Sequence, residues 1–148
     1  MRISATLLFA RLMIGWIFIP SGISKLLDNA TTATYIESTA GLLFPSLLGW
    51  CTGLFEVSFG LAILVGFQTA KAGIALSAFC VAAAFLFHAG KGNIPGLSED
   101  AVRLISELHF FMVFKNISMA GGLLALAMHG AGDWSVDAKL MKREANSA

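Results

Sequence analysis

Charge is scarce in this sequence. Of its 148 residues only 13% are Asp, Glu, Lys or Arg, about half the roughly 25% that is usual in soluble domains. The ten Lys and Arg nearly balance the nine Asp and Glu, which leaves a formal net charge of +1. A nucleic-acid-binding protein needs a basic surface, and a disordered chain is polar or strongly charged, so both classes are excluded. Nucleic acid is therefore not expected as a partner.

Cysteine is scarce too, and metal-binding patterns are absent. Cys51 and Cys80 lack the CxxC spacing of a zinc ribbon, and two cysteines do not make a disulfide framework. We interpret both as small apolar residues. The sequence has no haem-attachment or iron–sulfur spacing and no HxxxH pair. It thus predicts no metal site and no covalently bound cofactor.

What the chain has in abundance is long apolar sequence, since 57% of its residues are hydrophobic. A helix needs about 20 mostly apolar residues to cross the hydrocarbon core of a bilayer. Four stretches meet this length, at about residues 5–23, 47–67, 72–90 and 108–128. They lack the charged outer face of helices in soluble proteins. The sequence therefore predicts an all-α, integral membrane four-helix bundle in a lipid bilayer.

The first stretch is interpreted as a retained helix rather than a cleaved signal peptide. Arg11 interrupts its apolar run, and no A-x-A site follows promptly.

The connecting segments carry helix start and stop signals. Residues 28–32 favour a helix start, and Gly41 and Pro45 favour a stop, so we expect a short interfacial helix between the first two spans. The segment before the third span is short enough only for a tight turn. Ser98 is expected to cap a helix that begins amphipathic and runs into the fourth span.

Four spans place both termini on the same side of the membrane. That side carries five basic residues and the other side three, which favours termini in the cytoplasm. We therefore divide the chain into a membrane domain over residues 1–132 and a polar cytoplasmic tail over residues 133–148.

Small and polar residues share helical stripes in each span. Small residues mark close packing of membrane helices, and ionisable residues in a span face protein or water because exposure to lipid is costly. Both rules select the same faces. The side chains expected to turn inward are Arg11, Lys25, Glu56, His88, Lys115 and Asn116.

Two interpretations of this polar set remain open. Any one of these residues serves equally well as structural glue between helices, but the set as a whole favours a ligand or proton path. Glu56 is the candidate catalytic carboxylate, accepting a proton or orienting a ligand, with Arg11 and Asn116 holding it. Lys25, His88 and Lys115 would attract a small hydrophobic or anionic ligand, such as a quinone head group, a phenolate or a sulfur oxyanion. His88 would also carry protons.

These residues lie in motifs that resemble the DoxX family of membrane proteins. The resemblance rests on Arg11-Leu12, Gly15, Phe18, Gly22 and Lys25-Leu26 in the first span, and on Gly53, Glu56-Val57, Gly60, Leu64 and Gly66 in the second. It extends to Lys115-Asn116, Gly121-Gly122-Leu123, Gly130, Gly132-Asp133-Trp134-Ser135-Val136 and Asp137 near the end.

The resemblance implies a bacterial inner-membrane protein with four transmembrane helices and a role in a redox system. It implies quinone as the non-covalent cofactor or ligand, and a redox partner protein, since relatives include subunits of a thiosulfate:quinone oxidoreductase. Whether the chain itself is an enzyme is left open. Two alternatives remain, a proton-coupled transporter of small molecules and a non-enzymatic scaffold for a redox enzyme.

Overall fold

The computed structural model describes residues 2–92 and 96–147, and in this part of the chain helices joined by turns and loops form the structure, without strands. Residues 93–95, in the loop predicted before the fourth span, lie outside it. The helices are α1 (Arg2–Leu27), α2 (Asn29–Ala40), α3 (Pro45–Val65), α4 (Thr69–Ala83), the π-helix η1 (Ala84–His88), α5 (Glu99–His129) and α6 (Val136–Ser147).

Four helical segments have the length and apolar character to cross a membrane: Ile3–Leu27, Pro45–Val65, Thr69–His88 and Glu99–His129. They coincide with the four predicted spans, so the predicted all-α membrane fold is confirmed. The α5 helix has 31 residues and a length of about 46 Å, more than the roughly 30 Å of the hydrocarbon core. It runs without a break from the amphipathic start into the fourth span.

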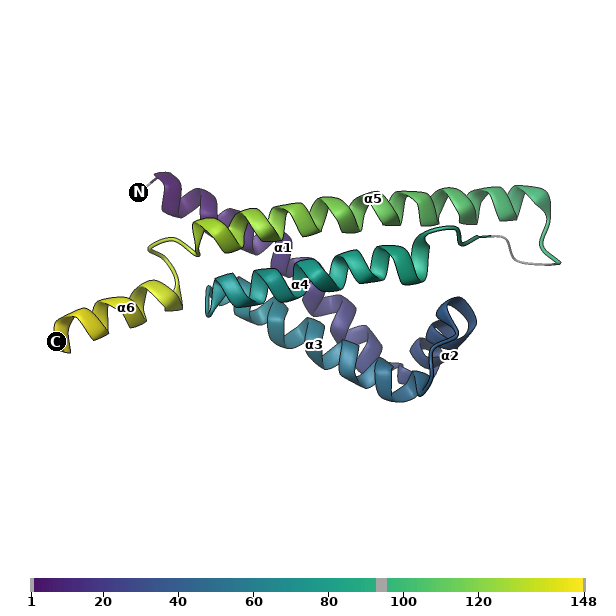
Figure 1. Cartoon of the computed structure of the whole chain (residues 1–148), viewed down its shortest axis with the longest axis horizontal. Coiled ribbons are helices and arrows are strands. Elements are labelled where there is room, and N and C mark those ends of the chain that lie inside the picture. The colour runs from purple at the N-terminus through teal and green to yellow at the C-terminus, as the bar shows by residue number, and fades with distance from the viewer. Residues whose placement is uncertain (1, 93–95, 148) are drawn as a thin grey trace.

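The four long helices form two pairs that cross each other (Figure 1). α1 packs against α3, and α4 packs against α5. The N-terminus, the turn between α3 and α4, and α6 lie at one end of the molecule, which we call the terminal end. The short helix α2 and the loop after η1 lie at the opposite end, the loop end, where the two pairs diverge.

Glycines bring the backbones of α1 and α3 into contact. A Cβ atom at Gly22 would lie 2.6 Å from the carbonyl oxygen of Gly53, and one at Gly15 would lie 3.2 Å from that of Gly60. These are the small-residue stripes that the sequence indicated. In the second pair, a Cβ atom at Gly73 would lie 2.9 Å from the carbonyl oxygen of Leu123. Close approach at glycine therefore sets the register of both pairs.

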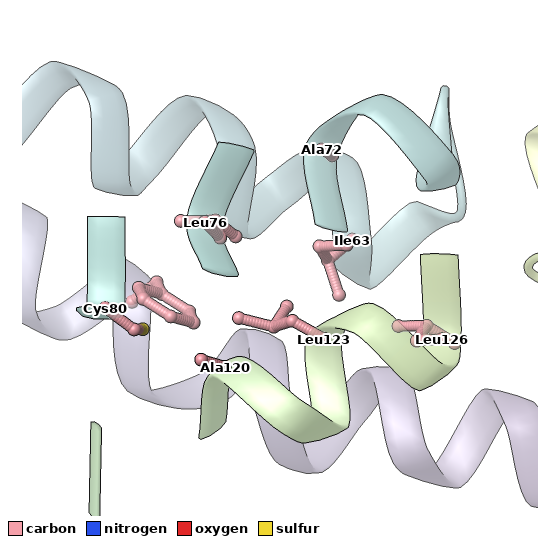
Figure 2. Close-up of a cluster of buried hydrophobic side chains, with 8 residues drawn as sticks. Ile63, Ala72, Leu76, Cys80, Ala120, Leu123 and Leu126 are labelled. Atoms are coloured by element: carbon pink, nitrogen blue, oxygen red, sulfur yellow. The ribbon is translucent and has the colours of Figure 1, made fainter. Parts of the chain in front are cut away.

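Apolar side chains join the two pairs between the middle of the bundle and the terminal end. Figure 2 shows side chains of α3, α4 and α5 pointing toward one another in this core. Ile63, Leu76 and Leu123 are fully buried there. Phe18 of α1 belongs to the same cluster, so every membrane-crossing helix contributes to it.

The short helix α2 begins and ends where the sequence predicted. Asp28 caps it, since the Asp28 carboxylate accepts a hydrogen bond from the Thr31 backbone N–H at 3.1 Å. Thr31 lowers the pKa of Asp28, first through its side-chain hydroxyl and then through this backbone N–H. Gly41 ends the helix with a φ of +61°, a conformation that glycine adopts without strain. Ser98 caps α5 in the same way, as predicted.

The close approach of α1 to α3 predicts a sharp cost for adding one methyl group. Gly22→Ala should lower the free energy of unfolding by about 1–3 kcal/mol, because the new Cβ meets backbone atoms of α3. Reversible unfolding in detergent micelles, followed by circular dichroism, measures it. Gly121→Ala on α5 is the matched control, since a Cβ there meets nothing within 4 Å. Equal stability of the two variants would contradict the proposed register.

Candidate functional site

A cavity of about 250 Å³ lies at the loop end, where the two helix pairs diverge. Side chains from α1, α2, α3, α4, η1 and α5 line it, so it lies inside the bundle rather than on one helix. Its polar lining residues are Ser21, Lys25, Thr32, Tyr35, Thr52, Glu56, His88 and Lys115. The rest of its wall is apolar and partly aromatic, from Phe79 and Phe87 among others.

Glu56 forms an ion pair with Lys25 in the wall of this cavity. Glu56 lies near the middle of α3 and is 3% exposed. The Lys25 Nζ atom donates to Glu56 Oε2 at 2.9 Å and to Ser21 Oγ at 2.7 Å. The Lys25 side chain thus folds back one turn along α1, toward the middle of the membrane. A buried carboxylate is tolerated at this depth because the Lys25 ammonium compensates its charge, and the Ser21 hydroxyl accepts a further hydrogen bond from that ammonium.

Lys115 is a second cation on the same cavity. It lies on α5, at the exposed rim of the site. Among the residues that the structure describes, the ion pairs are Lys25–Glu56 and Arg103–Glu107, so Lys115 lacks a carboxylate partner. Because Lys25 and Glu56 neutralise each other, Lys115 leaves the cavity with a net positive charge.

His88 borders the cavity and contacts a second histidine. Its Nδ1 atom lies 3.1 Å from Nδ1 of His109 on α5, a hydrogen-bond distance. His88 ends the π-helix η1, and π-helical turns occur often at functional sites. His109 is not among the site residues predicted from the sequence. The sequence feature that could have predicted their contact is that both histidines lie near the loop-side ends of neighbouring spans.

The helix α2 closes the cavity on one side. The Tyr35 ring stacks on Phe87 of η1 with centroids 5.9 Å apart, and its hydroxyl donates to the Phe87 carbonyl oxygen at 3.4 Å. Partial burial raises the pKa of Tyr35. Lys91 ties α2 further to the loop after η1, donating to the Thr39 carbonyl oxygen at 2.6 Å. Sequence reasoning missed Tyr35, because an interfacial helix alone does not reveal what it covers.

Arg11 lies outside this site. Its side chain leaves α1 14 residues before Lys25, or about 21 Å toward the terminal end. It is fully buried and donates to the carbonyl oxygens of Leu64 at 3.2 Å and Trp134 at 2.6 Å. Arg11 therefore joins three segments of the fold instead of holding Glu56, and that prediction is wrong.

Asn116 is buried as predicted, at 6% exposure, but it does not line the cavity. Within the described part of the chain its side chain makes no hydrogen bond, so it does not hold Glu56 either. The structure thus brings together four of the predicted site residues, Lys25, Glu56, His88 and Lys115.

Comparison of the sequence with known proteins identifies its family. The DoxX family model matches residues 6–89, more than half of the chain. The chain belongs to the DoxX family. It is 31% identical over 138 residues to the inner membrane protein YqjF of Escherichia coli K12, with 92% of each chain covered. It is 29% identical over 131 residues to the inner membrane protein YphA of the same organism, with 88% of this chain and 87% of YphA covered.

With four apolar helices and these relatives, the DoxX protein is a multi-pass inner membrane protein, as predicted. No solved structure matches the chain.

The end of the DoxX chain docks onto the terminal end of the bundle. The Asp137 carboxylate accepts hydrogen bonds from the backbone N–H groups of Gln68 at 2.7 Å and Thr69 at 2.9 Å, where α4 begins. The Ser4 hydroxyl donates to Asp133 at 2.6 Å. Asp133, before α6, therefore contacts α1, and Asp137, in the first turn of α6, contacts the α3–α4 turn. With Arg11 these residues form a structural cluster.

The ion pair in the cavity predicts an asymmetric cost of mutation. Lys25→Met should lower the free energy of unfolding by about 3 kcal/mol, because it leaves the Glu56 carboxylate buried without a cation. The double variant Lys25→Met/Glu56→Gln should regain most of this loss. Thermal unfolding in detergent measures both. Arg103→Met is the control, since the Arg103–Glu107 pair is exposed and should contribute little. A double variant no more stable than Lys25→Met would contradict the pairing.

The docked tail predicts a role for Asp137 in starting α4. Asp137→Ala should lower the free energy of unfolding by about 1–2 kcal/mol, because two N–H groups at the start of α4 lose their acceptor. Hydrogen exchange at Gln68 and Thr69 should accelerate with it. Glu144→Ala, on the exposed part of α6, is the control. Unchanged exchange at both amides would show that the tail does not cap α4 in the membrane.

Proposed function

We propose that this DoxX protein binds a small, single-ring anionic ligand, a phenolate or the ionised form of a quinone-like molecule, in the cavity at the loop end. The observation that carries the proposal is the charge of the site. Lys25 and Glu56 neutralise each other, whereas Lys115 lacks a carboxylate partner among the described residues. An uncompensated cation within a membrane span is costly, and an anion beside Lys115 would remove that cost.

The size and lining of the cavity support a single aromatic ring. Pockets for drug-sized ligands usually measure about 300–1,000 Å³, and this one is slightly smaller, at about 250 Å³. Phe79, Phe87 and Tyr35 offer aromatic surfaces for a ring. The hydroxyls of Ser21 and Thr52 and the polar heads of Lys25 and Lys115 offer partners for its oxygen atoms.

Glu56 has a distinct part in this proposal. It holds Lys25 in the cavity wall, and its carboxylate is the base that accepts a proton from a phenol or hydroquinone hydroxyl. Interconversion of quinone and hydroquinone moves protons together with electrons. Electrons would come from or go to a redox partner protein, which gives the chain its place in a redox system.

The arrangement of the core favours binding over transport. Between Glu56 and the terminal end lie the fully buried side chains of Ile63, Leu76 and Leu123. Ile63 lies two turns, or about 10 Å, beyond Glu56 on α3. A ligand in the cavity would thus meet packed apolar side chains rather than a polar path across the membrane.

A pair of matched probes tests the proposed charge preference. 4-Nitrophenolate, whose absorbance reports its ionisation, should bind purified protein in lipid nanodiscs, and Lys115→Met should weaken its binding at least tenfold, or about 1.4 kcal/mol. Nitrobenzene has the same ring without the ionised oxygen. Its affinity should be the same for the parent and the variant, because only the charge is removed.

Lys139→Met, on the exposed face of α6, serves as the control variant and should bind both probes like the parent. Loss of both probes in Lys115→Met would mean that the substitution damages the fold. Equal affinity of the parent and Lys115→Met for 4-nitrophenolate, or no binding to the parent, would overturn the proposed function.

A further inference from the structure

A proton that leaves a ligand or Glu56 in the cavity needs a route to water. The cavity is lined by six helical elements, and the packed apolar core lies on its terminal side. An exit would therefore lead toward the loop end. The groups at that end that exchange protons most readily near neutral pH are histidines.

The contact between His88 and His109 has the geometry of such a route. His88 borders the cavity, whereas His109 does not line it. The 3.1 Å between their Nδ1 atoms requires one ring to carry a hydrogen on Nδ1 and the other to offer its lone pair there. His109 lies on α5 six residues before Lys115, or about 9 Å closer to the loop end. The pair thus spans from the cavity wall toward the membrane surface.

From this geometry we infer that His88 and His109 form a proton relay between the cavity and the aqueous phase at the loop end. The inference rests on the proposed function for its source of protons. His88 takes a proton from the cavity on Nε2 and passes its Nδ1 proton to Nδ1 of His109. His109 releases its Nε2 proton to water. Each ring gains one proton and loses one, and both return to their starting tautomers when their ring hydrogens exchange back.

The charged groups around the His88–His109 pair disfavour a proton that stays on His88. The other titratable groups on the same cavity are Lys25 on α1, Tyr35 on α2, Glu56 on α3 and Lys115 on α5. The net positive charge of Lys115 disfavours a lasting imidazolium at His88, because two like charges would share one small site. His109, with Nδ1 3.1 Å from that of His88, is the neighbouring group that accepts the proton in this relay.

The π-helical turn positions the relay. At the end of η1 the Ala89 backbone N–H donates to the Ala84 carbonyl oxygen at 2.8 Å, five residues back, and this wider turn contains the stacked Phe87 and the paired His88. Tyr35 donates to the Phe87 carbonyl oxygen and so secures the turn from α2. His88 thereby faces both the cavity and α5.

A ligand-free experiment tests the relay independently of the proposed function. In nanodiscs with ¹⁵N-histidine-labelled protein, NMR follows the exchange of the His88 ring N–H with D₂O. His109→Phe keeps a ring of similar shape without a proton carrier, and it should slow this exchange at least tenfold. His129→Phe, at the opposite end of α5, is the matched control and should leave it unchanged. Unchanged exchange in His109→Phe would overturn the relay, whether or not a phenol binds.

A second measurement uses the ligand. After rapid mixing with 4-nitrophenol, the rate at which bound phenolate appears should fall at least tenfold in His109→Phe, while its equilibrium affinity stays within twofold of the parent. Added imidazole should restore part of the rate. An unchanged rate with normal affinity would overturn the relay and leave the binding proposal standing. Absence of binding in the parent would overturn the proposed function, and the exchange experiment alone would then decide on the relay.

Discussion

A carboxylate in the middle of a membrane-crossing helix is the constraint on which this structure depends. Lipid offers no partner to Glu56, so the protein has to supply one. Lys25 does so by folding back from near the end of α1, with Ser21 sharing its ammonium group. The Lys25 side chain can reach Glu56 because Gly22 and Gly53 let the backbones of α1 and α3 come into contact. The glycine stripe and the ion pair are thus parts of one contact between α1 and α3.

The polar groups of the bundle fall into two clusters with different physical characters. At the terminal end, Arg11 donates hydrogen bonds to backbone carbonyl oxygens of other segments, and Asp137 accepts them from backbone N–H groups. These hydrogen bonds tie α1, the α3–α4 turn and the segment around the start of α6 together and so stabilise the fold. At the loop end, Lys115 and His88 border the open volume of the cavity.

The α2 helix and η1 both line the cavity between the diverging helix pairs. The α2 helix rests on η1 through Tyr35 and Phe87, and Lys91 ties the following loop to its end. The same elements therefore bound the cavity and position His88. In this DoxX protein the packed apolar core lies toward the terminal end and the cavity lies at the loop end.

The sequence by itself determined the elements of this protein. The four spans follow from apolar length, the ends of α2 and α5 follow from Asp28, Gly41 and Ser98, and the inward faces follow from the cost of charge in lipid. These signals are local, since each is carried by neighbours along one helix.

Only the tertiary structure decided which polar groups meet. Lys25, not Arg11, pairs with Glu56, because the crossing of α1 and α3 sets the depth at which each side chain faces its neighbour. His109 meets His88 through the antiparallel register of α4 and α5. Partner choice depends on the rotation and offset of packed helices, to which residues far apart in the chain contribute together, and no single span encodes it.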